Sequence, residues 1–164
     1  MGHAFGLKTL TTVADDAAAA FVADLGATRA INFKTEDFVE VTRAAGGADI
    51  ILDIIGGDYI ARNIKAASPD ARIIQLAFNG GSKVEINLTP VMLKRLSYTG
   101  STLRSRPDAF KAEGATALTE QGWPLFAAGK LNPVTHTVLP LADAAKAHEM
   151  MEAASHMGKL LLTP

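Results

Sequence analysis

Residues 48–64, ADIILDIIGGDYIARNI, contain an apolar run, a glycine pair and a helix-forming segment in immediate succession. The almost unbroken apolar run over residues 48–53 is typical of a strand that is covered on both faces, as in a parallel sheet. Gly56 and Gly57 permit a tight turn, and residues 58–67 then predict a helix. The stretch therefore contains the strand and the crossover helix of one βαβ unit.

The same alternation of strands and helices extends in both directions from this stretch. Helix N-caps are expected at Asp15 or Asp16 and at Thr35, whereas residues 68–70, Ser-Pro-Asp, have turn chemistry. Strands are predicted at residues 8–13, 29–32, 71–78, 96–102, 134–139 and 159–162, and further helices after Asp15, after Thr35 and at residues 90–95, 107–128 and 142–154. This order predicts an α/β fold with a doubly wound parallel sheet, in which a ligand lies beyond the carboxyl ends of the strands.

The composition is that of an ordinary globular domain. The 164 residues are 48% hydrophobic and 20% charged, with a formal net charge of −1 and no cysteine. Without a basic stripe, nucleic acid and anionic membranes are poor candidates as partners. The lack of cysteine excludes disulfides, thiol nucleophiles and thiolate metal sites. No apolar run reaches the ~18 residues of a membrane span and no signal-peptide pattern occurs, so we expect a cytoplasmic protein.

Three turns that leave predicted strands are candidates for a ligand site. They are residues 53–57, DIIGG, residues 77–81, AFNGG, and residues 100–104, GSTLR. Each has glycine or a small polar residue where a strand ends, which allows the backbone to approach a flat ligand closely. An ordinary turn is the simpler explanation of any one glycine pair. Three such turns at successive strand ends favour a shared crevice.

Other residues give weaker signals. Asp15 or Asp16 follows the first predicted strand, where a carboxylate can bind the ribose hydroxyls of a dinucleotide. The same residues suit a helix N-cap, and both interpretations stay open. The four histidines have no convincing zinc-ligand spacing. The sequence supports no catalytic triad, and we assign no catalytic residue.

Five segments together resemble one known family. They are LGATRAINFKTEDFVE at residues 25–40, ADIILDIIGGDYIARNI at 48–64, ARIIQLAFNGG at 71–81, LSYTGSTLRSR at 96–106 and HMGKLLL at 156–162. Their order and spacing, over nearly the whole chain, resemble the quinone oxidoreductase branch of the medium-chain dehydrogenase/reductase superfamily. Members have a GroES-like catalytic domain followed by a Rossmann domain, and they reduce quinones or enones with NADPH or NADH. The resemblance implies NAD(P)H as the cofactor and a small quinone or enone as the substrate of the intact enzyme.

The resemblance also implies positions for the cofactor-binding residues. Asp53, Gly56 and Gly57 would line the dinucleotide crevice, Phe78, Asn79 and Gly80 would approach the nicotinamide, and Ser101, Thr102 and Arg104 would belong to the segment that closes over the cofactor. The strand at residues 96–102 resembles the edge strand through which such proteins pair into homodimers. Zinc-dependent relatives keep their ligands mainly in the catalytic domain, so the branch resemblance is the reason to predict no zinc.

Two departures from the family pattern bear on the choice of cofactor. NADPH-using relatives typically carry serine and then lysine after the second strand, where this chain has Asp15 and Ala18. They often have tyrosine in an I-N-Y motif, where this chain has Phe33. Each change removes a group that could hold a 2′-phosphate, and Asp15 adds a repelling charge. We therefore expect NADH to be favoured over NADPH, with Asp15 and Phe33 among the cofactor-binding residues.

One part of the dinucleotide fold has no counterpart in the sequence. Residues 1–6, MGHAFG, resemble the last turn of the first Rossmann helix, and no G-x-G-x-x-G motif occurs. We expect residues 1–133 to form a Rossmann domain that lacks its first, central strand and its glycine-rich loop. The flanking strands must then close up, leave a gap or borrow a strand. Residues 134–164 resemble a segment that packs on the catalytic domain, so exposed apolar surface and association are expected.

Three functions stay in contention. The first is the cofactor-binding part of an NAD(P)H-dependent quinone or enone oxidoreductase, in which the cofactor supplies the hydride. The second is a non-catalytic nucleotide-binding or dimerisation module, and the third is an inert truncation product. Activity of this chain alone is not expected, because the amide donors of the phosphate loop and the catalytic domain are missing from the sequence.

Overall fold

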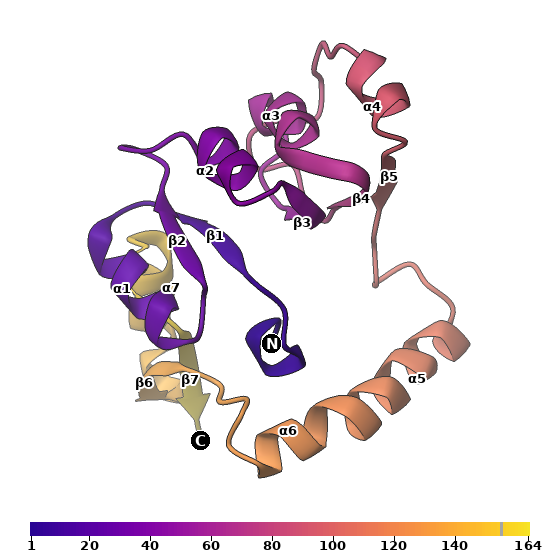
Figure 1. The fold of residues 1–164 in the computed structure, drawn as a ribbon. Helices are drawn as coiled ribbons and strands as arrows, with labels where there is room; N and C mark the ends of the chain where they lie inside the picture. Colours follow the sequence, from indigo (N-terminus) through magenta and orange to yellow (C-terminus); the bar gives the residue numbers. More distant parts are fainter. Residues whose placement is uncertain (155) are drawn as a thin grey trace.

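The computed structural model describes residues 1–154 and 156–164, which form an α/β fold of parallel sheets (Figure 1). The strands are β1 (Leu10–Val13), β2 (Arg29–Asn32), β3 (Ala48–Asp53), β4 (Ala67–Gln75), β5 (Ser97–Gly100), β6 (Thr135–Pro140) and β7 (Lys159–Thr163). The helices are α1 (Asp16–Asp24), α2 (Phe38–Ala44), α3 (Asp58–Ala66), α4 (Thr89–Leu93), α5 (Asp108–Ala117), α6 (Trp123–Ala127) and α7 (Ala144–Glu152). Short helical turns are η1 (His3–Phe5), η2 (Leu118–Gly122) and η3 (Leu141–Asp143). The predicted alternation is confirmed.

Neighbouring strands are parallel and form three separate sheets with the orders β1-β2, β3-β4-β5 and β6-β7. In a dinucleotide-binding fold the first strand lies between the second and the fourth, a position that corresponds here to the space between β1 and β3. Among the described residues no strand occupies that position, so the chain leaves a gap there. We call residues 10–44 the first unit and residues 48–100 the second unit.

Packing between α2 and α3 joins the two units. The rings of Phe38 and Tyr59 stack with their centroids 5.0 Å apart, and the guanidinium carbon of Arg62 lies 4.3 Å from the Phe38 ring centroid. Arg62 also donates a hydrogen bond of 2.9 Å to the Asp37 carboxylate. A buried cluster that spans both units contains Ile31, Phe38, Val39 and Ala66. Helix contacts therefore hold the units together where the sheet is interrupted.

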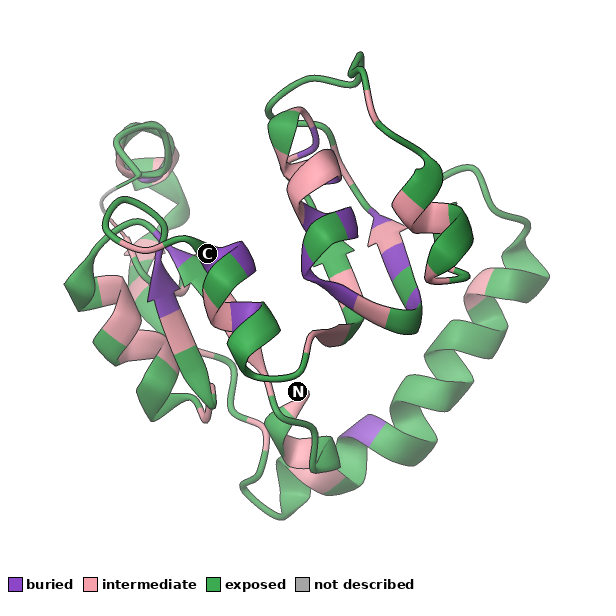
Figure 2. Cartoon of the chain, turned by 45° about the horizontal axis from the view of Figure 1, so that its top comes forward, coloured by how far each residue is buried: buried purple, intermediate pink, exposed green. Residues whose placement is uncertain are grey.

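The core of the second unit lies on one face of its sheet. Its buried cluster consists of Ile60, Ile64, Ala67, Ala71 and Ile73. The helical residues come from α3 and the others from β4, and the Ile73 side chain is completely inaccessible. Figure 2 shows buried (purple) stretches on α3 and on a neighbouring strand of the second unit.

The predicted coverage of residues 48–53 on both faces is wrong. Ile50 and Leu52 are 58% and 65% exposed, whereas Asp53 is buried. Successive side chains of a strand point to opposite faces, and α3 covers only the face that carries Ile51 and Asp53. The apolar run therefore contains one buried face and one exposed face.

Two helix caps were predicted, and one of them is wrong. Asp15 caps α1, because its Oδ1 accepts a hydrogen bond of 2.8 Å from the Ala18 amide. The cap of α2 is Asp37, not Thr35. The Thr35 amide instead donates to the Asn32 carbonyl at 3.0 Å, so a turn closes on the end of β2 before α2 begins.

The turn predicted at residues 68–70 is wrong, because these residues lie within β4, where they form a bulge. Ala48 pairs with Ala67, whereas Ile50 pairs with Arg72, so the residues between bulge away from β3. Asp70 has φ 62°, and Arg95 binds its carboxylate at 2.7 and 2.6 Å. The bulge is therefore held by an ion pair to the segment before β5. β5 itself is shorter than the predicted strand at residues 96–102.

The predicted helix at residues 107–128 consists of α5, η2 and α6, which arch outside the two units (Figure 1). η2 is a π-helical turn directly before α6, where Pro124 lacks an amide hydrogen for a regular helical bond. β6 and β7 then form a small sheet of their own. Val138, Leu161 and Leu162 are exposed on it, as expected for the C-terminal segment. In residues 1–154 and 156–164, none of the helices has the length and apolar character needed to span a membrane.

Candidate functional site

Two glycine-containing turns contact each other at the carboxyl ends of β3 and β4. The Gly57 amide donates to the Gly81 carbonyl at 2.8 Å, and the Gly80 amide donates to the Ile55 carbonyl at 2.6 Å. A third and longer bond, of 3.3 Å, runs from the Asn79 amide to the Ile54 carbonyl. The predicted turns at residues 53–57 and 77–81 therefore form one rigid, hydrogen-bonded structure.

Glycine is required in the first turn for conformation and for space. Gly56 and Gly57 have φ of 70° and 53°, in the region that favours glycine. A Cβ atom on Gly57 would lie 2.5 Å from the Gly80 carbonyl oxygen, and one on Gly56 would lie 2.7 Å from the Gly81 carbonyl oxygen. The close backbone approach predicted at these glycines is thus an approach of one turn to the other.

Asp53 holds the first turn from within. Asp53 is only 3% exposed. Its Oδ1 accepts hydrogen bonds from the backbone amides of Ile55 at 2.6 Å and Gly56 at 3.0 Å. Oδ2 accepts a bond of 2.8 Å from the amide side chain of Asn63 on α3. Both carboxylate oxygens therefore bind groups of the protein, and Asp53 fixes the conformation of this turn.

These internal bonds determine what the paired turns can offer a ligand. The amides of Ile55, Gly56, Gly57 and Gly80 already donate within the protein. The accessible residues with side chains suited to a ligand are Phe78, which is 47% exposed, and Asn79, which is also exposed. An aromatic ring beside a carboxamide suits a flat heteroaromatic group that also carries hydrogen-bonding groups.

A buried polar layer beneath the turns was not found by sequence reasoning. It consists of the buried side chains of Asp53, Asn63 and Gln75, and of Tyr98, which is 44% exposed and whose hydroxyl reaches Gln75 from β5. Gln75 gave the only signal, as a lone amide in the mostly apolar stretch ARIIQLAF. A buried amide requires partners, but the sequence does not show which residues provide them.

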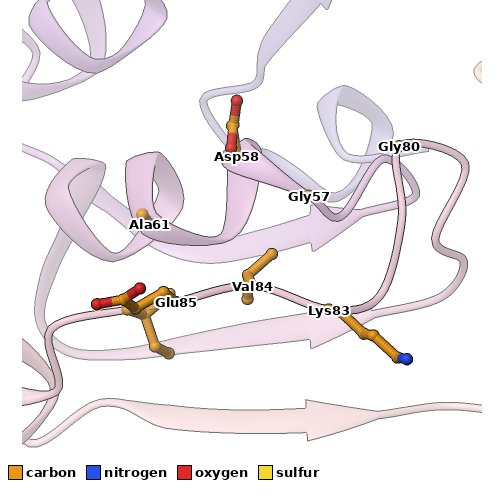
Figure 3. Close-up of a pocket in the computed structure, with 8 residues that line it drawn as sticks. Gly57, Asp58, Ala61, Gly80, Lys83, Val84 and Glu85 are labelled. Carbon is orange, nitrogen blue, oxygen red and sulfur yellow. The ribbon is translucent and has the colours of Figure 1, made fainter.

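A shallow cavity of about 550 Å³ lies beside the paired turns, between the start of α3 and residues 83–86. Its lining consists of Gly57, Asp58, Ala61, Gly80, Lys83, Val84, Glu85 and Ile86. Figure 3 shows the Val84 side chain turned towards α3, whereas the charged ends of Asp58 and Lys83 point in opposite directions. The volume is in the range of ligand pockets, but the charged groups do not converge on it.

The third predicted turn lies next to these two. The Ser101 amide donates to the Gln75 carbonyl at 3.0 Å, which places Ser101 at the carboxyl end of β5 beside the end of β4. The hydroxyls of Thr102 and Ser105 lie 3.1 Å apart. Arg104 is exposed and has no ion-pair partner within the part of the chain that the structure describes. The turn thus presents hydroxyls and one cation.

The remaining predicted residues lie on the first unit. Asp15 follows β1, where its carboxylate caps α1. Phe33 follows β2, and its amide donates to the Val13 carbonyl at 3.0 Å. The predicted residues therefore form two groups, one at the carboxyl end of the β1-β2 sheet and one at the carboxyl end of the β3-β4-β5 sheet, on either side of the gap between β1 and β3.

The described residues contain no group that fits zinc. Across residues 1–154 and 156–164, no three His, Asp or Glu side chains gather as a metal site would require. His136 and His156 come nearest to each other, with ring centroids 6.3 Å apart. Two imidazoles are fewer than the three or four protein ligands typical of a zinc site.

Comparisons with known proteins show which sequences this chain is similar to. A family model described as zinc-binding dehydrogenase matches residues 25–162. The quinone oxidoreductase of Sus scrofa is 28% identical over 169 residues, covering 99% of this chain and 49% of the relative. The chain thus spans about half the length of the curated relatives it matches.

Solved structures share the fold. An NAD-dependent alcohol dehydrogenase is 30% identical with a TM-score of 0.77, covering 98% of this chain and 45% of that one. The quinone oxidoreductase of Thermus thermophilus, whose structures include a complex with NADPH, has a TM-score of 0.81 at 23% identity. That match covers 99% of this chain and 52% of the other. The parallel sheets therefore correspond to a Rossmann-like nucleotide-binding domain.

Proposed function

Because the chain belongs to the zinc-binding dehydrogenase family, we propose that it supplies the nucleotide-binding part of an NAD(P)H-dependent quinone or enone oxidoreductase. The observation that carries this proposal is the gathering of the three predicted turns at the carboxyl ends of β3, β4 and β5. Ligands of open α/β sheets bind at this edge. When bound, the nicotinamide supplies a hydride to the substrate.

In this proposal the residues of the chain bind and orient the cofactor. Phe78 and Asn79 provide a ring face and a carboxamide for the nicotinamide end, and Asp53, Gly56, Gly57 and Gly80 set the position of both. Ser101, Thr102 and Arg104 lie over the cofactor, while Asp15 and Phe33 contact the adenosine end. Residues 1–133 constitute the nucleotide-binding domain and residues 134–164 a segment that packs on a catalytic domain. The separate β6-β7 sheet supports this division.

The direct test is a fluorescence titration of the purified chain with NADH and NADPH. The proposal expects saturable binding of the reduced nucleotide. A chain that is folded by circular dichroism yet binds neither nucleotide would contradict it. Binding without turnover of quinones or enones fits both this proposal and the alternative, a non-catalytic nucleotide-binding module, because activity of this chain alone is not expected.

We propose further that the chain prefers NADH to NADPH. The Asp15 carboxylate follows β1, where it would repel a 2′-phosphate, and we expect NADH to bind about fivefold more tightly or better. Asp15→Asn separates charge from capping, because asparagine is an equally good N-cap. The variant should bind NADPH more tightly and leave NADH binding and stability nearly unchanged. Asp16→Asn, at the neighbouring position, is the matched control, and an equal gain in NADPH affinity there would contradict the role of Asp15.

A homodimer through β5 is the partner that we propose. All four residues of β5 are exposed, and the strand pairs with β4 on one side, so its other edge is available for a second copy. Sedimentation should detect a dimer that Thr99→Lys weakens by placing like charges across the interface. Thr119→Lys, at an exposed helical position, should leave it intact. A wild-type monomer at all concentrations would contradict the proposal.

The remaining parts of the proposal concern metal and compartment. We propose a zinc-independent protein, so elemental analysis of the purified chain should find no stoichiometric zinc. A cytoplasmic location fits a sequence without cysteine, since disulfides form mainly in oxidising compartments. Fractionation that recovered the protein outside the cytoplasm would contradict this assignment.

A further inference from the structure

Gln75 connects the ends of three strands through one buried amide side chain. The residue is 4% exposed and lies at the end of β4, between β3 and β5. Its Nε2 donates to the Asp53 carbonyl at 3.2 Å and to the Ala77 carbonyl at 2.6 Å. Its Oε1 accepts a bond of 2.6 Å from the Tyr98 hydroxyl on β5. Each hydrogen-bonding end of the amide is therefore occupied.

The chemistry of the partners fixes the direction of this chain of bonds. Carbonyl oxygens only accept, so the amide nitrogen of Gln75 must face Asp53 and Ala77. Its oxygen then faces Tyr98, whose hydroxyl must donate. A tyrosine hydroxyl is protonated at neutral pH because its ordinary pKa is 10.0, and burial, followed by the charge of Asp53, raises the pKa of Tyr98 further. Only this orientation of the Gln75 amide gives a partner to both carbonyls and to the Tyr98 hydroxyl.

The bond to Ala77 matters for the turn that follows. Ala77 directly precedes Phe78 and Asn79, the two side chains that the paired turns expose. The far end of the turn is held by the bond from the Gly80 amide to the Ile55 carbonyl. At the near end of the turn, the side-chain amide of Gln75 donates to the Ala77 carbonyl. A displacement of Gln75 would therefore move Phe78 before it moved Gly80.

We propose that Gln75 and Tyr98 are positioning residues of the nucleotide site, which fix the Phe78–Asn79 side chains against the nicotinamide end of the ligand. This inference rests on the proposed function and deepens it. Tyr98 acts through Gln75, and Gln75 acts through the Ala77 carbonyl. Neither side chain needs to touch the nucleotide.

Tyr98→Phe is the sharpest test, because it removes only the hydroxyl. We expect NADH to bind about three- to tenfold more weakly, the range of one net hydrogen bond. ADP-ribose, which has no nicotinamide, should bind as it does to the wild-type chain. Thr99→Val, on the adjacent residue of the same strand, is the matched control and should change neither affinity.

A double-mutant cycle tests whether Tyr98 acts through Gln75. Gln75→Met removes the amide at similar length, and Tyr98→Phe should then have no further effect on NADH affinity. Additive losses of NADH affinity in the double variant would overturn the proposal that Tyr98 acts through Gln75. Equal losses for NADH and ADP-ribose in Tyr98→Phe would show a general structural role and would also overturn it, as would unchanged NADH affinity.

Amide resonances separate this inference from the proposed function. If the wild-type chain bound neither NADH nor ADP-ribose, the proposed function would fail, but the positioning of the turn would still be measurable by NMR. Tyr98→Phe should shift the amide signals of residues 77–81 and speed their hydrogen exchange, whereas Thr99→Val should not. Unaltered signals in that turn would overturn the positioning role.

Discussion

The two units of the fold differ in how the carboxyl ends of their strands are fixed. In the first unit, the Asp15 carboxylate accepts one amide bond and serves as a helix cap. In the second unit, the buried Asp53 carboxylate accepts two amide bonds and a third from Asn63, beneath two interlocked turns. The strand ends of the first unit are held by this cap and by single bonds from Asn32 to Asp16 and from Phe33 to Val13, whereas those of the second unit are held by a buried carboxylate and by the bonds between two interlocked turns.

This difference indicates how the candidate site is divided. The second unit has its turns set by internal bonds, so its ligand-facing side chains are pre-organised. The first unit depends on a cap and on packing between α2 and α3 for its position. We therefore expect comparable substitutions to lower the free energy of unfolding more in the second unit than in the first. Pairs of substitutions, one in each unit, can test this.

Replacing the two carboxylates should produce the largest contrast. Asp53→Ala leaves two backbone amides and the Asn63 side chain without their buried acceptor, so we expect a loss of about 3–4 kcal/mol in the free energy of unfolding. Asp15→Ala removes one exposed cap and should cost about 1 kcal/mol. Urea unfolding of both variants measures the difference. Equal losses would remove the distinction between the units.

Glycine replacements should give the second largest effect. Gly57→Ala adds a Cβ that meets the Gly80 carbonyl oxygen, besides strain at positive φ, so we expect a loss of about 2–4 kcal/mol. Gly46, in the link that follows α2 of the first unit, also has positive φ, but a Cβ there would meet open space, so Gly46→Ala should cost about 1–2 kcal/mol. Thermal unfolding compares them, and a Gly57→Ala variant no less stable than Gly46→Ala would argue against interlocked turns.

A smaller effect should come from Lys94, which binds the end of α3 in the second unit. Its ammonium donates to the carbonyls of Ile64, Lys65 and Ala67 at 3.1, 3.0 and 2.8 Å. Lys94→Met should cost about 1–2 kcal/mol, since charge-assisted bonds to these carbonyls are lost. Lys65→Met removes an exposed ammonium from the same helix and should lie within about 0.5 kcal/mol of wild type. Indistinguishable urea midpoints for the two variants would contradict the prediction.

The smallest effect should be a pH dependence of the contact between the units. The Val39 amide, and then Arg62, lower the pKa of the exposed Asp37 carboxyl below 3.8. A lowered carboxyl pKa stabilises the fold fully above the unfolded value and loses that stabilisation as pH falls through the folded value. The stability difference between wild type and Asp37→Asn should therefore shrink below about pH 4 in unfolding measurements. A difference that stays constant down to about pH 2 would exclude this contribution.

Much of the architecture was predictable from local patterns. Residues 29–32 and 48–53 form strands as predicted, and α1 begins after the Asp15 cap. The position of the α2 cap was not predictable in the same way. The Thr35 amide donates to the Asn32 carbonyl in a turn whose position depends on where β2 ends, so α2 begins only after Asp37. Threonine and aspartate are both good caps, so propensity could not choose between Thr35 and Asp37.

The candidate site was predictable in its location but not in its bonding. Glycine pairs at strand ends indicated Gly56, Gly57 and Gly80, which the structure brings together. The sequence does not reveal that their amides are used by the opposite turn, nor that Tyr98 reaches Gln75 from 23 residues away. Such pairings depend on strand order and register.

The sequence by itself determined the alternation of strands and helices, the parallel class of the sheet and the positions of its turns, because those follow from hydrophobic periodicity and backbone preferences within a few residues. Only the tertiary structure decided which face of β3 is covered, that β1 and β3 remain apart, and that Asp53, Asn63, Gln75 and Tyr98 share one polar layer. The physical reason is that burial and hydrogen bonding of these groups depend on neighbours from distant segments, whose approach is fixed by the packing of α3 on its sheet.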